Sequence, residues 1–140
     1  MRAWGPCAGA LLLAAALPCP ALGASDEERR QICAEAEQRY QEVVGKPSKE
    51  AGVAVVMMYK YTFCPWRLTV KPGQAVRWIN VDKRTTHSVW FKDDGLPESD
   101  RKFSGETVEM TVDLPAGEHA YLCGPHWERD GMTATLVVAP

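Results

Sequence analysis

The stretch that most constrains the fold runs from Cys123 to Met132 and has the sequence CGPHWERDGM. It offers a thiol, an imidazole and a thioether within ten residues, on Cys123, His126 and Met132. The segments directly before and after it are rich in β-forming residues, which predicts a loop between two strands at one end of a sheet. A further imidazole, His87, belongs to an earlier predicted strand. The sequence therefore predicts that four potential metal donors meet where these strands end.

The chemistry of these four side chains indicates copper. Thiolate and thioether sulfur favour Cu(I), imidazole suits either oxidation state, and two His, one Cys and a weak axial Met form a type 1 copper site. We therefore predict one copper ion per chain, with His87, Cys123 and His126 as trigonal ligands and Met132 as the axial ligand. A rigid site of this kind changes little when an electron arrives, and this favours fast electron transfer.

Two other kinds of site use the same residue types. Structural zinc rarely uses Met, and no second Cys or His follows Cys123 and His126 at short spacing. A Cys123 nucleophile with a histidine base is the other alternative, but both residues share one tight loop without an evident oxyanion-binding or orienting group. We therefore predict that the protein is not an enzyme.

His119 is the remaining histidine of the chain. It lies four residues before Cys123 on the same predicted strand, which separates the two by about 13 Å at the rise of a strand. His119 therefore cannot share the metal, and we expect it to be a structural or surface residue.

Short β-forming segments separated by turn signals make up residues 53–140. The sequence KPGQ at residues 71–74, for example, predicts a turn between two of them. The expected strands span residues 53–59, 67–70, 75–79, 87–91, 106–112, 119–123 and 132–138. Seven or so short strands in this arrangement predict an all-β domain, an antiparallel sandwich over residues 53–140.

Residues 1–24 have the pattern of a cleaved export signal. A positive residue, Arg2, precedes an apolar run over residues 8–17, and small residues surround a cleavage point after Gly23 or Ala24. Because a bilayer span needs about 20 apolar residues, this run is too short to cross a membrane. We therefore expect an exported protein without a membrane span.

Residues 25–52 are predicted to form an N-terminal helix and a linker. Ser25 and Glu28 have the spacing of a capping box, and apolar residues then recur at helical intervals. Gly45 and Pro47 end the pattern. The expected helix spans residues 26–44.

Export determines how the five cysteines are interpreted. Cys7 and Cys19 leave with the signal, so the mature chain keeps Cys33, Cys64 and Cys123. If copper takes Cys123, an oxidising compartment favours a Cys33–Cys64 disulfide that links the helix to the sandwich. Two buried, unpaired thiols are the alternative.

The charge pattern argues against nucleic acid as a partner. The formal net charge is −2, and Lys and Arg are scattered along the chain. Nucleic-acid-binding domains instead concentrate basic side chains on one face.

Residues 53–140 resemble the cupredoxins, the superfamily of plastocyanin, pseudoazurin and azurin. The similar segments are HSVWF at residues 87–91 with DGLP at 94–97, AYLCGPH at 120–126 with the following Gly131–Met132, and RLTV at 67–70. The resemblance implies a Greek-key β-sandwich of about seven to eight strands and a type 1 copper site. Residues 88–91 with ESDR at 98–101 are most similar to CopI, a periplasmic cupredoxin associated with copper tolerance.

Two departures from the plastocyanin-like pattern affect the site. Five residues separate His126 from Met132, where such loops usually have four or fewer. Ser88 occupies a place where an Asn often follows the first His and ties the two ligand loops together. Because a hydroxyl can donate only one hydrogen bond, we expect a weaker tie.

The resemblance implies a periplasmic protein, expected to be a monomer, that carries single electrons between redox partners such as a cytochrome or an oxidase. The alternative is a copper-tolerance protein of the CopI kind that binds or oxidises periplasmic copper. An interaction module that has only kept the fold is less consistent with four intact ligands.

Overall fold

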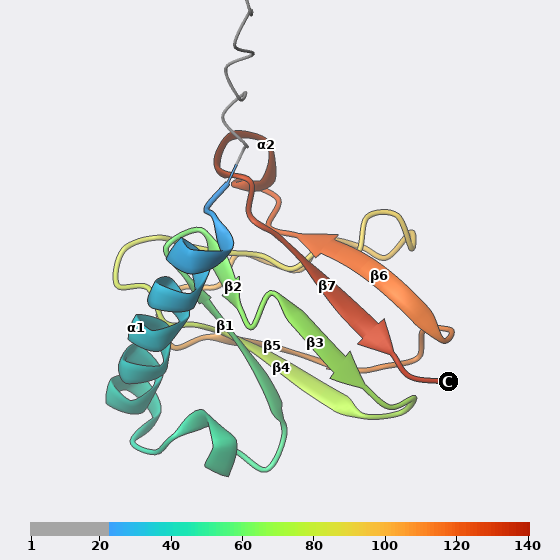
Figure 1. Ribbon diagram of the computed structural model, residues 1–140, viewed down its shortest axis with the longest axis horizontal. Helices are drawn as coiled ribbons and strands as arrows, with labels where there is room; N and C mark the ends of the chain where they lie inside the picture. The colour runs from blue at the N-terminus through green and yellow to red at the C-terminus, as the bar shows by residue number, and fades with distance from the viewer. Residues whose placement is uncertain (1–22) are drawn as a thin grey trace, which may run out of the picture.

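The computed structural model describes residues 23–140, in which seven strands form two facing sheets and a long helix lies along one flank (Figure 1). One sheet has the strand order β2-β1-β4-β5, and the other has the order β3-β7-β6. The strands are β1 (Ala54–Tyr59), β2 (Thr62–Cys64), β3 (Arg67–Val70), β4 (Ala75–Asn80), β5 (Thr107–Thr111), β6 (Gly117–Leu122) and β7 (Thr133–Val138). The expected sandwich, preceded by one N-terminal helix, is therefore confirmed.

The main core fills the space between the two sheets. Successive side chains of a strand point to opposite faces, so Val76 and Trp78 of β4 enter this core while Ile79 faces outward. Tyr121 of β6 lies at the centre, with its ring centroid 4.8 Å from that of Phe63 and 5.7 Å from that of Trp78. Aromatic side chains from both sheets thus pack against one another and stabilise the sandwich.

The helix α1 (Asp26–Val44) covers the outer face of the four-stranded sheet (Figure 1). Its bounds agree with the prediction, and the Ser25–Glu28 capping box is present. Buried Ala36 and Tyr40 pack against outward-facing residues of β1 and β4. The predicted disulfide is also present, because Cys33 of α1 is bonded to Cys64 of β2.

The strand pairing differs from the antiparallel arrangement expected from the sequence. β1 pairs with β4 in parallel, and β3 pairs with β7 in parallel. Turn signals specify how consecutive strands are connected, whereas other strands separate each of these two pairs in the sequence. The chain passes from one sheet to the other after β2, so neighbours in space are not neighbours in sequence.

The predicted strand over residues 87–91 is not a strand in the structure. Its backbone makes two isolated bridges instead, His87 with Lys102 and Trp90 with Leu122 of β6. The segment first pairs with Lys102, which lies outside the strands, and then with the edge strand β6. It therefore does not stay beside one strand long enough to form a continuous ladder. Conversely, the sequence did not predict the three-residue strand β2, which pairs with β1 through a two-residue turn.

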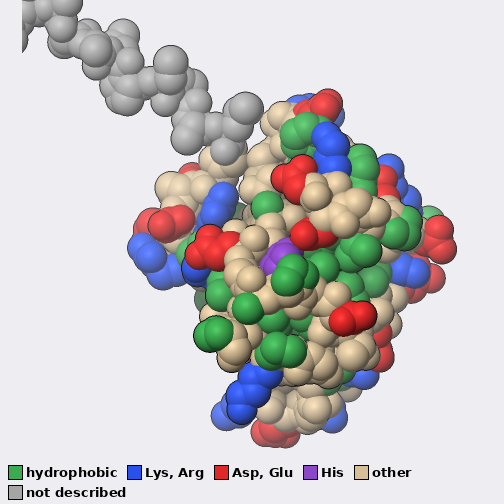
Figure 2. Space-filling model, turned by 90° about the vertical axis from the view of Figure 1, so that its right-hand side faces the viewer, with side chains coloured by type: hydrophobic (Ala, Val, Ile, Leu, Met, Phe, Trp, Pro, Cys, Tyr) green, Lys and Arg blue, Asp and Glu red, His purple; other side chains and the backbone are tan. Residues whose placement is uncertain are grey.

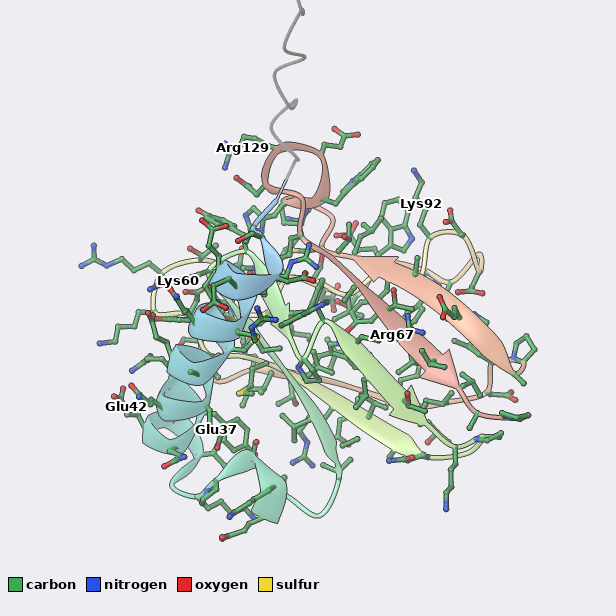
Figure 3. All side chains as sticks on the ribbon, in the orientation of Figure 1. Glu37, Glu42, Lys60, Arg67, Lys92 and Arg129 are labelled. Atoms are coloured by element: carbon green, nitrogen blue, oxygen red, sulfur yellow. A yellow bond between two sulfur atoms is a disulfide. The ribbon has the colours of Figure 1, made fainter. Side chains whose placement is uncertain are left out.

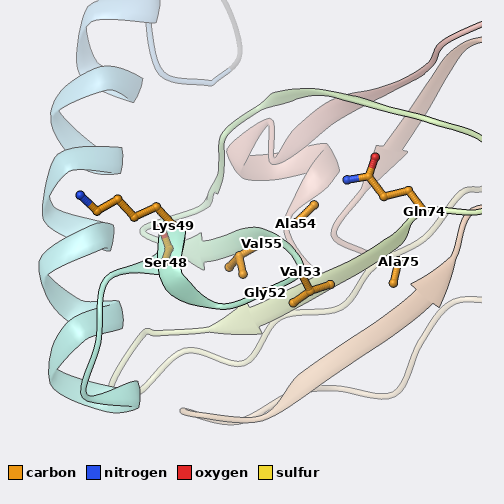
Figure 4. Close-up of a pocket in the computed structure, with 8 residues that line it drawn as sticks. All are labelled: Ser48, Lys49, Gly52, Val53, Ala54, Val55, Gln74 and Ala75. Carbon is orange, nitrogen blue, oxygen red and sulfur yellow. The ribbon is translucent and has the colours of Figure 1, made fainter.

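A groove of about 500 Å³ lies between the short helix η1 (Ser48–Glu50) and the first residues of β1 and β4 (Figure 4). The parallel strands β1 and β4 both start there, and both end at the opposite end of the sheet, near Tyr59 and Asn80. The eight residues that line this groove include no His, Cys, Asp or Glu.

Both signs of charge are distributed over the surface. On the face in Figure 2, hydrophobic side chains gather centrally, and Lys, Arg, Asp and Glu side chains surround them. Cross-strand ion pairs such as Arg67–Glu118 and Arg77–Glu109 are solvent-exposed, so each contributes little to stability. The predicted export signal lies almost wholly outside the described residues, and no helix among residues 23–140 is long and apolar enough to span a membrane.

Candidate metal centre

Three of the predicted ligands meet at the end of the sandwich where β4 and β6 finish. The ligand atoms that His87, Cys123 and His126 can offer all lie within 4.8 Å of one another. The Cys123 Sγ atom is 3.7 Å from Nδ1 of His87 and 3.3 Å from Nδ1 of His126. Both imidazoles therefore present Nδ1 to the sulfur, and the three donor atoms are close enough to share one metal ion.

The long spacer between His126 and Met132 is accommodated by a single helical turn, α2 (Trp127–Asp130). Gly131 ends it with a left-handed φ of 65°, a conformation that glycine adopts at no steric cost. The loop then closes on itself, because Cys123 N–H donates to Met132 O at 3.1 Å and Met132 N–H donates to His126 O at 3.2 Å. Met132 is fully buried beneath this closed loop.

Burial sets the protonation of the donor groups. It raises the pKa of the Cys123 thiol, so a metal must displace a proton from this sulfur. Burial, followed by the nearby His87 ring, lowers the pKa of His126. The His126 imidazole is therefore neutral near pH 7, which is the form that donates to a metal.

The Ser88 hydroxyl ties the two ligand segments together. It does so by accepting a hydrogen bond, whereas the sequence suggested that it would donate one. Its hydroxyl accepts a hydrogen bond from Gly124 N–H at 2.9 Å and donates one to Glu98 Oε1 at 2.6 Å. Its backbone N–H also points at Cys123 Sγ, at 3.4 Å. A Cβ atom at residue 124 would overlap the Glu98 carboxylate, so any larger residue would displace Glu98 from the Ser88 hydroxyl. The sequence did not identify Glu98 as part of the site, because only the fold brings it beside the Cys123 loop.

Two aromatic residues lie close to partly exposed His126, one across the fold and one next to it in the chain. Tyr61, in the turn between β1 and β2, makes an edge contact with His126 at a centroid distance of 5.0 Å. Trp127 follows His126 directly and lies 4.8 Å from the Lys92 ammonium, which is labelled in Figure 3. Tyr61 was not predicted from sequence, because its hairpin was not recognised.

His119 is a structural residue, as expected. Its Nδ1 contacts the Asp94 carboxylate at 2.7 Å and its Nε2 contacts the Pro115 carbonyl at 2.8 Å. Both partners can only accept, so both ring nitrogens must carry protons. The hydrogen bond to Pro115, together with that to Asp94, raises the pKa of buried His119.

This charged His119 is expected to make stability depend on pH. Because its folded-state pKa lies above the ordinary value of 6.5, the stabilisation is fully present below about pH 6.5 and is lost as the pH rises through the folded-state pKa. His119→Gln should be less stable than the parent protein at pH 5.5, and the difference should shrink by pH 8.5. Urea unfolding across this range measures it, and a difference independent of pH would contradict a charged His119.

The donor set fits copper better than zinc or a nucleophilic cysteine. One thiolate and two imidazoles converge, and buried Met132 follows them on the same loop. Among residues 23–140, no other group of three His, Cys, Asp or Glu side chains is placed to hold a metal ion. The fold and the site together define a mononuclear copper protein built on a β-sandwich.

The family model described as copper binding proteins, plastocyanin/azurin family, matches residues 51–139, which is more than half of the chain. The chain therefore belongs to the plastocyanin/azurin family and is a copper-binding cupredoxin.

Individual relatives agree with this assignment. A plastocyanin from Nostoc punctiforme is 30% identical over 90 residues, which are 54% of this chain and 63% of that plastocyanin. The chain thus spans less than two thirds of this relative. An oxidized amicyanin mutant superimposes with a TM-score of 0.54 at 27% identity, over 62% of this chain and 82% of amicyanin. A Cu-containing nitrite reductase from Thermus scotoductus shares the fold, with a TM-score of 0.54 and 24% identity over 63% of this chain and 22% of the reductase.

Proposed function

We propose that His87, Cys123, His126 and Met132 bind one copper ion and that the protein carries single electrons between periplasmic redox partners. The observation that carries this proposal is the convergence of two Nδ1 atoms on the Cys123 sulfur. The family and its electron-carrying relatives support the same chemistry. Bound copper supplies the one-electron couple, and the residues of this chain hold its donors in a fixed arrangement.

Two features of the chain favour rapid electron exchange. The loop that carries Cys123, His126 and Met132 is closed by its own backbone hydrogen bonds, and the Ser88 hydroxyl links it to the segment that carries His87. Donors held in this way need little reorganisation between Cu(II) and Cu(I). His126 is partly exposed, so electrons can leave through its imidazole.

The surface around His126 suits docking of a redox protein such as a cytochrome or an oxidase. Tyr61, which is 41% exposed, packs edge-on against the imidazole, and partly exposed Trp127 follows His126 in the chain. Aromatic side chains of this kind provide much of the binding energy at protein interfaces. We therefore place the electron-transfer contact on Tyr61, His126 and Trp127.

Trp127→Glu is expected to slow electron transfer to a c-type cytochrome by about tenfold, because a charge replaces an aromatic docking residue. The visible spectrum and reduction potential should change little, since Trp127 offers no metal donor. Stopped-flow mixing of the reduced protein with oxidised cytochrome measures the rate. Gln74→Glu is the matched control, because it adds the same charge in the groove at the opposite end of the sheet.

Equal rates for Trp127→Glu and Gln74→Glu would remove the docking surface from the proposal.

The competing function is copper tolerance, and it is tested in cells that lack the gene. Normal respiration together with sharply increased sensitivity to added copper would replace electron carriage with copper tolerance as the function of this site.

A further inference from the structure

The nitrogen of His87 that faces away from Cys123 contacts a carboxylate. Its Nε2 lies 2.6 Å from Oδ2 of Asp82, five residues earlier in the chain. The His87 side chain is completely buried, and that of Asp82 is only 13% exposed. Since a carboxylate accepts hydrogen bonds, Nε2 carries a proton, and in the neutral imidazole this leaves the lone pair on Nδ1, the nitrogen that faces the Cys123 sulfur.

The same carboxylate oxygen holds a second segment of the site. The backbone N–H of Lys60 donates to Asp82 Oδ2 at 3.0 Å. Lys60 and Tyr61 form the two-residue turn between β1 and β2, and both are left-handed, with φ values of 45° and 58°. Turns of this type prefer Asn and Gly, so the Lys–Tyr sequence is held in a costly conformation. Strain of this kind is often stored at functional sites.

The strained turn brings an aromatic ring over the donors. Tyr61 contacts His126 at a centroid distance of 5.0 Å and lies 6.5 Å from the His87 ring, both in edge geometry. Lys60 extends from the turn toward α1, where it pairs with Glu35 (Figure 3). The turn is therefore fastened on one side by this ion pair and on the other by Asp82.

We propose that Asp82 is a positioning residue that tunes the metal centre in two ways. Its hydrogen bond fixes the tautomer of His87 and makes this imidazole a stronger donor, which favours Cu(II) over Cu(I). Its bond to Lys60 N–H holds Tyr61 against the two imidazoles, where the ring limits access of water. This inference rests on the proposed binding of copper by His87.

Two substitutions separate the charge of Asp82 from its hydrogen bonds. Asp82→Asn keeps an amide oxygen as acceptor but removes the negative charge, whereas Asp82→Ala removes both. Loss of a partner of a ligating histidine typically lowers metal affinity by about 10- to 100-fold. The reduction potential rises by about 59 mV for each tenfold loss of Cu(II) affinity relative to Cu(I) affinity. We expect about a tenfold loss in Asp82→Asn and a larger one in Asp82→Ala.

Asp130→Asn is the matched control. Asp130 lies near His126, and its backbone N–H donates to the His126 carbonyl at 3.1 Å. Its carboxylate acts on His126 only through space, and among residues 23–140 it hydrogen-bonds Arg129 and no ligand. This variant removes the same charge and should change the Cu(II) affinity by no more than about twofold, because the Asp130 carboxylate acts on His126 at longer range than a hydrogen bond. Equal shifts in Asp82→Asn and Asp130→Asn would show that charge alone is responsible and would overturn the positioning role.

Measurements on the metal-free protein test the inference without copper. Long-range ¹H–¹⁵N correlation spectra should show His87 protonated at Nε2 in the parent protein and in Asp82→Asn, and a mixture of tautomers in Asp82→Ala. Exchange of the Lys60 amide hydrogen should be slow in the parent protein and accelerate in Asp82→Ala. A parent protein that fails to bind copper would end the proposed function, whereas unchanged tautomer, amide exchange and potential in both Asp82 variants would end only this inference.

Discussion

The Cys123→Ser variant is expected to lose the intense visible absorption of the copper-loaded protein completely. This absorption arises from charge transfer between a thiolate and Cu(II), and a serine hydroxyl cannot supply it. Among residues 23–140, Cys123 is the only cysteine that is not in a disulfide. Titration of the metal-free protein with Cu(II), followed by visible spectroscopy, measures the effect.

Met132→Leu is the matched control for this loss of colour. Leucine fills a similar buried volume but removes the thioether, so the variant should keep copper and colour while its reduction potential rises. Cys123→Ser is nearly isosteric, and a near-UV circular dichroism spectrum like that of the parent protein will establish that it is folded. Full colour in Cys123→Ser would rule out Cys123 as a ligand.

Replacing both cysteines of the disulfide, as in Cys33→Ala with Cys64→Ala, should reduce the free energy of unfolding by about 3 to 4 kcal/mol in the chain-entropy model. The bond joins residues 31 positions apart, so it restricts the unfolded chain considerably. It is also the covalent link between α1 and the edge strand β2. Urea unfolding of the metal-free proteins at equal pH measures the difference.

A second pair of substitutions separates the cross-link from packing. Cys33→Ser with Cys64→Ser preserves the side-chain size better at the fully buried Cys64 position but adds hydroxyl groups. Both double variants should nevertheless unfold at a lower urea concentration than the parent protein. A loss below about 1 kcal/mol in the alanine variant would contradict a stabilising role, since a typical disulfide contributes about 2 to 4 kcal/mol.

Features encoded by neighbouring residues were predicted accurately from the sequence. The Ser25–Glu28 capping box marks the start of α1, and Gly45 marks its end. Both signals are local, because their residues lie at the helix ends themselves. The strand over residues 67–70 has the predicted bounds. The loop from Cys123 to Met132 was recognised because its donors are close in sequence and have strands on either side.

Features that depend on distant parts of the chain were not predicted. No local pattern specifies that β1 lies parallel to β4 or that residues 87–91 make only isolated bridges, to Lys102 and to Leu122 of β6. The turn before β2 contains Lys60 and Tyr61 in place of the usual Gly or Asn, so no turn signal marks the hairpin. Asp82 and Glu98 resemble ordinary loop carboxylates until the fold brings each beside a donor or its neighbour.

The ten-residue loop between β6 and β7 also has a consequence for how the chain acquires its metal. Cys123, His126 and Met132 are already close together before any sheet has formed, so a nascent or unfolded chain can capture copper through this segment alone. A ligand stabilises the native state only to the extent that it binds that state more tightly than the unfolded one. The increase in melting temperature on copper loading should therefore be smaller than the copper affinity of the folded protein alone implies. His87 reaches the other donors only when the sandwich has formed, so it should account for most of the difference in copper affinity between the folded and unfolded states.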